Sequence, residues 1–255
     1  MTKTRQQTSR KPEREKKRTF ADSAWDNFKQ ILAAVILALV IKTSIVEAYK
    51  IPSQSMEDTL LVGDFLLANK FVYGARLPVV NWRLPSFKQP HSGDVVIFIY
   101  PVDGVTKYIK RCVAGPEDTV LIKDKELFVN GKRFPNPEYS KFIDLARNGD
   151  PVIQPRRPGG ADSRDNFGPY IVPRNCYFMM GDNRDNSYDS RYWGAVHKDL
   201  ILGEAILVHW SWDDTNHPSP EVSTDDPLSV PRLFVYNSVH FFQKVRWNRL
   251  FNLIS

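Results

Sequence analysis

The sequence predicts a mainly β domain that follows one N-terminal apolar helix. Residues 31–41 (ILAAVILALVI) form an uninterrupted apolar run. Beyond residue 50 the chain changes to short β-branched and aromatic runs, which Gly, Pro, Asp or Asn residues separate. Hydrophobic residues make up 42% of the 255 and charged residues 25%, which is ordinary for a folded protein.

The net charge of +6 belongs to the N-terminal tail. Residues 1–18 carry eight Lys or Arg and two Glu, and the remaining 27 basic and 27 acidic residues balance each other. Because the excess is confined to a tail, it does not indicate a nucleic-acid-binding domain. We expect residues 1–29 to form a basic tail that stays on the cytoplasmic side of a membrane.

Residues 30–46 are the apolar segment, with Lys42 as their single charge. As a helix they would be roughly 25 Å long, the lower limit for crossing a bilayer. A buried helix, a cleaved signal peptide and a membrane anchor are the three interpretations. The run is apolar on all faces, which disfavours the first. Val46-Glu47-Ala48 is a passable cleavage site, but the segment before the run is long for a signal peptide. We therefore expect a transmembrane anchor.

The strands of the β domain are expected in two parts of a core, residues 47–130 and 170–255. The Val-Asn-Gly sequence at residues 129–131 is a hairpin turn signal, and nothing suggests alternating βαβ units. The β-branched and aromatic runs that predict strands are residues 94–100, 107–113, 119–123, 126–130, 170–172, 177–180 and 202–210.

The other stretches predict loops. Residues 131–169 are rich in Pro, Gly, Arg and Asp and are expected to be a poorly ordered, variable insertion. Residues 213–231 contain four prolines and five acidic residues and predict a loop. In the tail from residue 233 to 255, six aromatic residues alternate with Lys and Arg. This pattern suits a membrane interface and equally a sheet edge packed into the core.

Cys112 and Cys176 are too few for a disulfide framework and match no metal-ligand spacing. We expect both to be buried free thiols.

Familiar hydrolase motifs are absent from the sequence. It has no G-x-S-x-G elbow and no H-E-x-x-H helix, and its five histidines lie in no recognisable triad context. A Ser-His-Asp enzyme stays open, because triads form in space. The other base is a lysine amine, which must be desolvated to be neutral. Lys110 lies in the apolar strand KYIKRCV, although strand lysines usually face solvent.

Two polar stretches are candidate sites. Residues 52–60 (PSQSMEDTL) place Ser53 and Ser55 shortly after the apolar segment, as a turn, a helix cap or a nucleophile near a membrane. Residues 181–194 (GDNRDNSYDSRYWG) gather three Asp, two Asn and two Arg. A calcium loop is disfavoured because its glycine and closing glutamate are missing. A polar turn held by an Asp189–Arg191 pair is the structural alternative.

Four blocks follow the apolar segment in the order IPSQSM…TLLVGD, SGDVVIF, YIKRCVAGPED and YFMMGDNRDNSYDSRYWG. With these blocks the sequence resembles bacterial type I signal peptidase, the leader peptidase, a serine protease with a Ser-Lys dyad. The last block is the most specific. The resemblance implies an antiparallel-sheet catalytic domain of the signal-peptidase type, with no cofactor and no metal.

The resemblance also implies roles for individual residues. Ser55 would be the nucleophile and Lys110 its base. The Ser53 hydroxyl would join the Ser55 N–H in the oxyanion hole, and Ser187 would orient the lysine amine. Asp182, Asp189 and Arg191 would shape the site without touching substrate. The residues that match the apolar lining of small substrate pockets are Ile51, Pro52, Met56, Leu60, Tyr108 and Ile109, with Tyr49 and Lys50 at the border.

The implied activity is removal of signal peptides from secretory preproteins after an Ala-x-Ala-like site, through an acyl-enzyme. The implied location is the bacterial inner membrane, single-pass, with the N-terminus cytoplasmic and the catalytic domain periplasmic. The expected partners are therefore preproteins and the lipid bilayer, and not nucleic acid. The substrate would bind as an added strand.

The sequence departs from the family at Asp58, where a proline is usual, and we expect this change to loosen the turn. A single anchor is evident, whereas some members carry two. One alternative is a related Ser-Lys protease that processes other precursors or cleaves itself. Another is a membrane-tethered β domain that scaffolds partners, with Ser55 in a turn and Lys110 on the surface. That alternative leaves the four blocks unexplained.

Overall fold

The computed structural model describes residues 20–44, 46–74, 85–135 and 165–254, in two compact units, residues 1–41 and 42–255. Helix α1, Phe20–Ser44, contains the apolar run and begins before the predicted segment. Over the part of the chain that is described, no helix is long and apolar enough to cross a membrane. The predicted anchor at residues 30–46 therefore stays a prediction.

Helix α1 ends at Ser44, whereas the predicted apolar segment extends to Val46. Val46 instead starts strand β1, Val46–Lys50, and every residue of β1 pairs with β2, Asp64–Asn69. The possible cleavage site Val46-Glu47-Ala48 is thus part of a sheet. Cleavage after Ala48 would remove the first three residues of β1 from the sheet.

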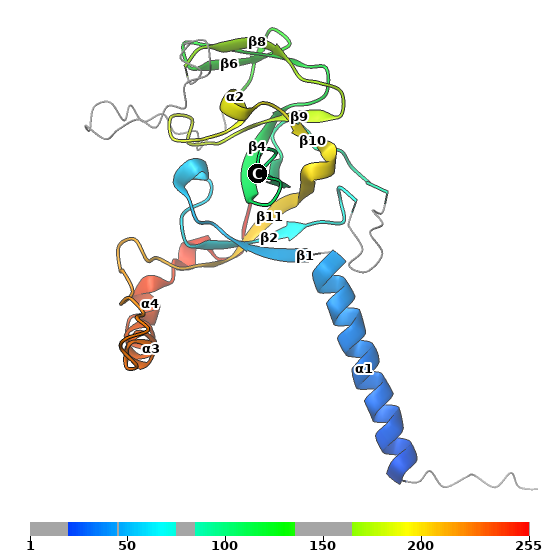
Figure 1. The fold of residues 1–255 in the computed structure, drawn as a ribbon, viewed down its shortest axis with the longest axis vertical. Coiled ribbons are helices and arrows are strands. Elements are labelled where there is room, and N and C mark those ends of the chain that lie inside the picture. Colours follow the sequence, from blue (N-terminus) through cyan, green and yellow to red (C-terminus); the bar gives the residue numbers. More distant parts are fainter. Residues whose placement is uncertain (1–19, 45, 75–84, 136–164, 255) are drawn as a thin grey trace, which may run out of the picture. The chain divides into compact units, whose positions relative to one another are not determined.

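The β domain contains two antiparallel sheets, which confirms the β part of the predicted fold (Figure 1). The larger sheet has eight strands in the order β1-β2-β11-β3-β4-β9-β10, with β12 paired to β11. Its remaining strands are β3 (Val95–Ile99), β4 (Lys107–Ala114), β9 (Cys176–Met180), β10 (Val196–His197), β11 (Ile201–Ser211) and β12 (Asn252–Leu253).

The smaller sheet has the order β7-β6-β5-β8. Its strands are β5 (Thr119–Lys123), β6 (Glu126–Val129), β7 (Lys132–Arg133) and β8 (Phe167–Ile171). Asn130 and Gly131 join β6 to β7 with φ of 52° and 75°, so the predicted hairpin turn is confirmed. Strands β7 and β8 lie at the two ends of the predicted insertion, and residues 136–164 lie outside the described residues.

Three groups of buried apolar side chains form the core. One lies under β1, β2 and β11 and includes Ile51, Met56 and Leu60. A second joins β4 and β9 to the smaller sheet, and a third includes Cys112 between β3, β4 and β9. Cys112 is buried and Cys176 half-buried, and both are free thiols. The expectation of two free thiols is confirmed, although Cys176 is less buried than we expected.

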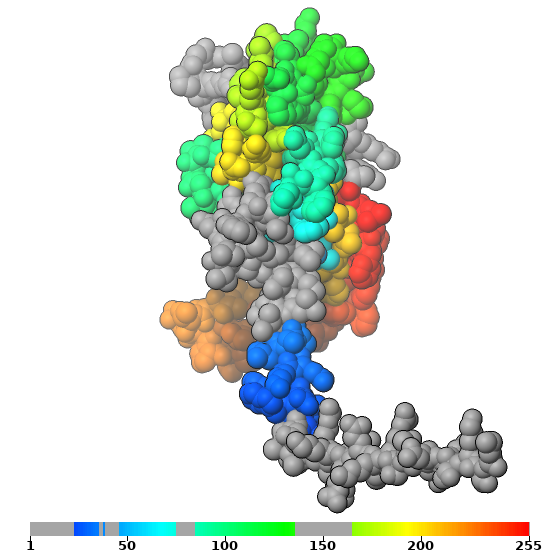
Figure 2. Space-filling view, turned by 90° about the vertical axis from the view of Figure 1, so that its right-hand side faces the viewer, coloured from blue at the N-terminus to red at the C-terminus, as the bar shows by residue number. Residues whose placement is uncertain are grey.

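The C-terminal segment contains helices that the sequence did not predict, and the membrane interface expected for it stays a prediction. Helices α3 (Ser229–Val239) and α4 (Phe241–Lys244) and the 3-10 helix η4 (Trp247–Arg249) precede β12, so α3 begins inside the predicted loop. In Figure 2 the last residues, in red, lie on the surface beside β11. The predicted sheet edge is confirmed for β12, which pairs with β11. The predicted packing into the core is wrong for Phe234, Phe242 and Phe251, whose side chains are 73%, 76% and 73% exposed.

Candidate active site

A tight turn between β1 and β2 presents Ser55. The 3-10 helix η1, Gln54–Met56, contains Ser55, and backbone hydrogen bonds between Ile51 and the Gly63–Asp64 segment close the base of the loop. Met56 and Leu60 point into the core and are buried. Because apolar side chains fix the turn on one side, the half-buried Ser55 faces the other.

The turn that follows Ser55 contains Asp58 and is closed by a backbone hydrogen bond. Glu57 has φ −55° and ψ 146°, Asp58 has φ 77°, and the Leu60 N–H donates to the Met56 carbonyl at 2.7 Å. These angles match the central residues of a type II turn. A proline, whose ring fixes φ near −65°, does not fit this backbone at position 58. The Leu60–Met56 hydrogen bond closes the turn with Asp58 in this conformation, so the expected loosening stays a prediction.

Strand β4 carries Lys110 into the same place. Its Nζ lies 2.5 Å from the Ser55 Oγ, and the residue is only 4% exposed. Burial lowers the pKa of Lys110 to about 8, because a charged amine loses its hydration there, although Asp189 and Asp182 partly oppose the change. A substantial fraction of the amine is therefore neutral near pH 8 and can accept a proton.

Ser53 and Ser187 lie close to Ser55 in different ways. The Ser53 Oγ is exposed and lies 3.3 Å from the Ser55 Oγ. Ser187 is buried beside Gly181, where any Cβ would collide with the Ser187 Oγ and the Ser55 carbonyl oxygen. Over the described residues, the Ser187 hydroxyl lies against Asp189 and helps to lower its pKa, and no hydrogen bond joins it to the Lys110 amine.

Two buried ion pairs surround the serine and the lysine. Asp182 accepts two hydrogen bonds from Arg111, both at 2.8 Å, and one from the Thr59 hydroxyl at 2.6 Å. One carboxylate thus joins the turn that follows Ser55, the strand that carries Lys110 and the segment 181–194. Since each charge has a matched partner, the cost of burying it is offset.

Asp189 and Arg191 form the second pair, as the sequence predicted. Two hydrogen bonds of 2.8 Å join them, and the Gly181 N–H donates to Asp189 at 3.0 Å. Burial alone would raise the pKa of Asp189, but the Arg191 guanidinium holds it below its usual value. Asp189 also caps the short helix α2, Ser190–Trp193. The segment is thus a rigid support behind the site.

Sequence reasoning missed three supporting residues. Arg111 was overlooked, although it follows Lys110 and must face the other side of β4. Gly181 is required because no Cβ fits there. The Asn183 side chain donates to the Gln54 carbonyl at 3.2 Å, and its backbone N–H donates to the Ser55 carbonyl at 3.2 Å. These contacts depend on the fold, so only the density of polar residues in 181–194 could have indicated them.

A cleft of about 530 Å³ opens beside the Ser55 and Lys110 side chains. Five of the predicted pocket residues line it, namely Ile51, Pro52, Met56, Tyr108 and Ile109, together with Tyr49, Lys50 and Lys107. Leu60 does not line it, because this side chain is fully buried in the core. Asn186 and Tyr188 line it and were missed.

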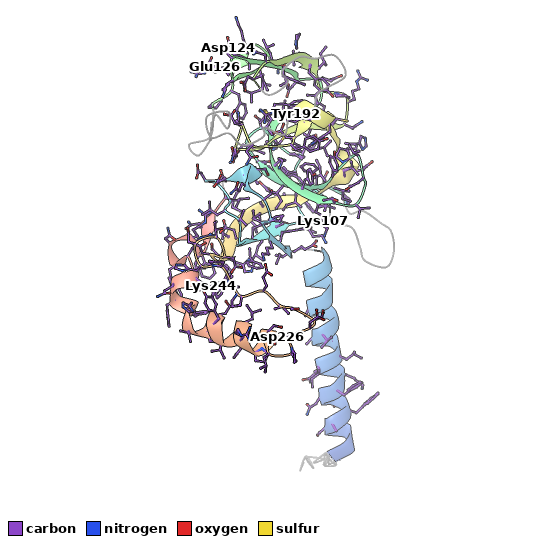
Figure 3. The ribbon with its side chains drawn as sticks, turned by 60° about the vertical axis from the view of Figure 1, so that its left-hand side comes forward. Lys107, Asp124, Glu126, Tyr192, Asp226 and Lys244 are labelled. Atoms are coloured by element: carbon purple, nitrogen blue, oxygen red, sulfur yellow. The ribbon has the colours of Figure 1, made fainter. Side chains whose placement is uncertain are left out.

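Two strand edges border the cleft. In the described residues β1 pairs with β2 alone, and residues 107–110 of β4 pair with β3 alone because β9 pairing begins at Arg111. Lys107, labelled in Figure 3, donates to Glu47 at 2.9 Å across the gap. Burial by itself would raise the pKa of Glu47, but Lys107, Tyr49 and Lys70 lower it to about 2. An extended chain can pair with these edges.

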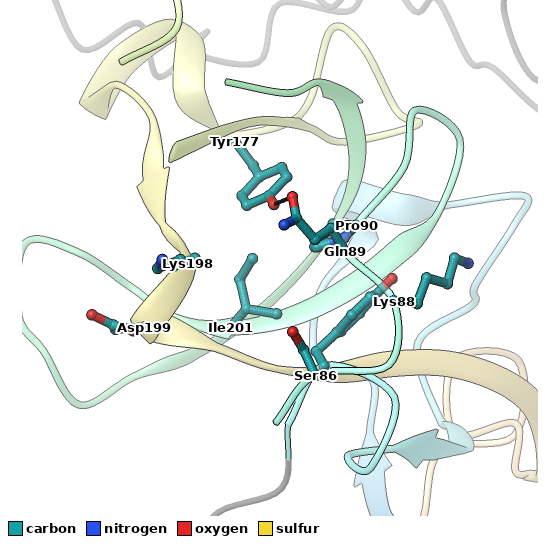
Figure 4. Close-up of a pocket in the computed structure, with 9 residues that line it drawn as sticks. Ser86, Lys88, Gln89, Pro90, Tyr177, Lys198, Asp199 and Ile201 are labelled. Atoms are coloured by element: carbon teal, nitrogen blue, oxygen red, sulfur yellow. Dashed lines mark hydrogen bonds between the residues drawn. The ribbon is translucent and has the colours of Figure 1, made fainter. Parts of the chain in front are cut away.

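A second cavity, of about 260 Å³, shares no lining residue with the cleft (Figure 4). Tyr177 donates a hydrogen bond to Gln89 at 3.2 Å inside it. Lys88, at its border, is held by Asp94 and Glu204. Among the residues that the structure describes, no group of three or more His, Cys, Asp or Glu side chains could hold a metal ion.

A serine hydroxyl beside a desolvated amine, in a cleft with open strand edges, is an arrangement that serine hydrolases acting on extended chains use. The family model described as "Signal peptidase, peptidase S26" matches residues 24–210. The chain belongs to this family and is a serine endopeptidase.

Similar proteins are named signal peptidase I. The Pseudomonas fluorescens protein is 39% identical over 76% of this chain and 74% of its own. The Pseudomonas aeruginosa protein is 39% identical over 73% of this chain and 72% of its own. The Aquifex aeolicus protein is 34% identical over 81% of this chain and 91% of its own. A crystal structure of signal peptidase I from Enterococcus faecalis superposes with a TM-score of 0.33 at 26% identity, over 46% of this chain and 97% of that one.

Proposed function

We propose that this endopeptidase removes N-terminal signal peptides from secreted preproteins, after an Ala-x-Ala-like site, through an acyl-enzyme on Ser55. Membership of the signal peptidase family supports the substrate class. The single observation that carries the mechanism is the 2.5 Å distance between the Ser55 Oγ and the buried Lys110 Nζ.

In the proposed first step the neutral Lys110 amine takes the proton of Ser55 while the Ser55 Oγ attacks the scissile carbonyl. The protonated amine then gives this proton to the leaving amino group, which departs as the N-terminus of the mature protein. Water, deprotonated by the same amine, hydrolyses the acyl-enzyme and restores Ser55. The lowered pKa of Lys110 supports both steps, because the amine must accept and release a proton near neutral pH.

The negative charge on the substrate oxygen needs donors. We assign this role to the Ser53 hydroxyl, 3.3 Å from the Ser55 Oγ, and to the Ser55 backbone N–H. Each such donor contributes on the order of 3 kcal/mol to stabilising the transition state. Ser187, buried beside Asp189 and Gly181, is proposed to steady the Lys110 amine while the proton moves.

The substrate is proposed to bind as an extended strand between β1 and residues 107–110 of β4. Apolar side chains at the bottom of the cleft, among them Ile51, Met56 and Ile109, leave room for small residues at positions −1 and −3. A larger side chain at either position would not fit, which explains an Ala-x-Ala-like site.

We further propose that helix α1 anchors the chain in the bacterial inner membrane, with the N-terminus cytoplasmic and the catalytic domain periplasmic. The apolar run at residues 31–41 and the basic residues before it support this topology. Such an anchor would keep the catalytic domain on the membrane from which signal peptides emerge.

The test is cleavage of a purified preprotein in detergent by the wild type, Ser55→Ala and Lys110→Ala. We expect both variants to lose cleavage while their circular dichroism and melting stay those of a folded protein. Lys123→Ala removes an exposed lysine of β5 and is the matched control, with full activity expected. Full activity in either site variant would reject the Ser-Lys mechanism, and loss of activity in His91→Ala or His197→Ala would favour a histidine base.

A further inference from the structure

Tyr188 borders the cleft but takes no part in the proposed chemistry. It follows Ser187 in the segment that supports the site, lines the same cleft as Ser55 and Lys110, and is 41% exposed. A large, partly exposed aromatic side chain at the border of a substrate cleft gains contact area when an extended chain binds.

The Tyr188 ring is held by other aromatic residues. The Tyr100 hydroxyl donates to the Tyr188 hydroxyl at 3.3 Å, and the two rings meet edge-on with centroids 6.1 Å apart. Tyr100 in turn stacks on Tyr108 at 4.6 Å. The Tyr188 ring also contacts the ring of Tyr192 on helix α2, labelled in Figure 3, with centroids 5.5 Å apart. The ring is thus fixed in advance, so little conformational entropy is lost when substrate contacts it.

The position of this aromatic group relative to the reacting atoms follows from β4. Tyr108 and Lys110 are two residues apart and lie on the same face of the strand, roughly 7 Å along it. The Lys110 Nζ lies 5.5 Å from the centre of the Tyr108 ring. A substrate strand paired with β4 therefore passes Tyr108 and Tyr188 within about two residues of the scissile bond.

We propose that Tyr188 is a specificity-determining residue that, with Tyr108, forms an aromatic wall against a substrate side chain at position −2, +1 or +2. Positions −1 and −3 are assigned to the small pockets. The wall favours a bulky apolar side chain, which buries area against the rings, over glycine. This inference rests on the proposed function.

The experiment measures kcat and KM of the detergent-solubilised full chain on peptides with Ala at −1 and −3. Gly, Leu or Phe is placed in turn at −2, +1 and +2. We expect the wild type to prefer Leu or Phe to Gly at one of these positions. Tyr188→Ala should reduce that preference about tenfold, mainly through KM, because ground-state contact is lost. Tyr188→Phe, which keeps the ring, should retain most of it.

Phe234→Ala is the control, because it removes an exposed aromatic ring on α3 that does not line the cleft, and it should keep the wild-type profile. An unchanged profile in Tyr188→Ala at all three positions, with wild-type cleavage intact, would overturn this inference alone. Failure of the wild type to cleave any of the peptides would overturn the proposed function and this inference together.

Discussion

Lys110 is a cation in an apolar strand, and this placement determines how activity depends on pH. Its pKa is lowered to about 8 because burial disfavours the charged amine. If the neutral amine is the base, kcat/KM rises about tenfold per pH unit on the acidic side and levels off above pH 8. A profile measured with a peptide substrate between pH 5.5 and 9.5 checks this. A midpoint near the ordinary lysine value of 10.5 would contradict the assignment.

The same burial costs stability. The pKa of Lys110 is lower in the folded chain than the ordinary 10.5, so between about pH 8 and 10.5 the unfolded chain binds more protons. Stability therefore rises with pH through this window, and the full cost, about 3 kcal/mol, applies below it. We expect Lys110→Met to raise the free energy of unfolding at pH 6 by about 1–3 kcal/mol, because a methionine needs no desolvation of charge.

Urea unfolding of the wild type and Lys110→Met at pH 6 and at pH 10.5 measures the effect. The difference between the two proteins should shrink at the higher pH, where the wild-type amine is neutral in the folded chain and about half neutral in the unfolded chain. A Lys110→Met protein that is less stable than the wild type at pH 6 would contradict the prediction. Cleavage should be lost in this variant, so stability and activity would change in opposite directions.

At the scale of elements, the segment 181–194 depends on buried charges that are paired. We expect Asp189→Ala to lower the free energy of unfolding by about 3–5 kcal/mol, because the buried Arg191 guanidinium loses its carboxylate. Arg174→Ala is the control, since the Arg174–Glu117 pair is 85% and 65% exposed and should contribute less than about 1 kcal/mol. Chemical denaturation of both variants tests this. Equal effects would show that burial of the pair is unimportant.

The strands that the sequence predicted are those with dense β-branched and aromatic residues. Strands β3 to β6, β9 and β11 bury one or both faces, and that burial selects such residues. Strand β1 was missed because VEAYK lies at a sheet edge, where polar residues are tolerated. Helix α3 was missed because Pro231 suggested a loop. A proline is tolerated in the first turn of a helix, because the backbone N–H groups of that turn have no acceptor within the helix.

Of the site, only the residues that lie in recognisable sequence motifs could be predicted. Ser55 and Lys110 are 55 residues apart, and their blocks identified them as candidates through the family resemblance. The Asp182–Arg111 link between β4 and the segment 181–194 comes from the register of β4 with β9, which no local pattern encodes. Leu60 was expected to line the substrate pocket but is buried in the core. Packing in the folded domain decides which way this side chain points, and no local pattern encodes it.

At the scale of the whole molecule, the C-terminal segment lies beyond the residues that the family model matches but is bonded to the loop that carries Ser55. Arg249 donates to the buried Asp64 at 2.7 Å and to the Thr59 carbonyl at 2.9 Å. Lys244, labelled in Figure 3, is fully buried in the same segment and donates to Asp214 at 2.6 Å. The end of the chain thus supports the loop that carries Ser55.

We expect Arg249→Ala to lower the free energy of unfolding by about 2–4 kcal/mol, because the Asp64 carboxylate is left buried without its closest cation. Cleavage should also fall, since the Thr59 carbonyl is released. Thermal melting and peptide cleavage are the measurements. Arg232→Ala, which removes an exposed pair with Asp226, is the control and should change neither. Wild-type melting in Arg249→Ala would contradict this role of the C-terminal segment.

The open edges of β1 and β4 also matter when many copies of the chain are present. An unpaired strand edge accepts any extended segment, including one from a neighbouring copy, and is a starting point for aggregation. Here the edges carry Lys50 and Lys107, and lysines on an edge hinder pairing between identical chains. The strand edges therefore have to stay open to a substrate chain while they resist pairing with a second copy of the protein. The solubility of the protein at high concentration depends on the charges that border the cleft.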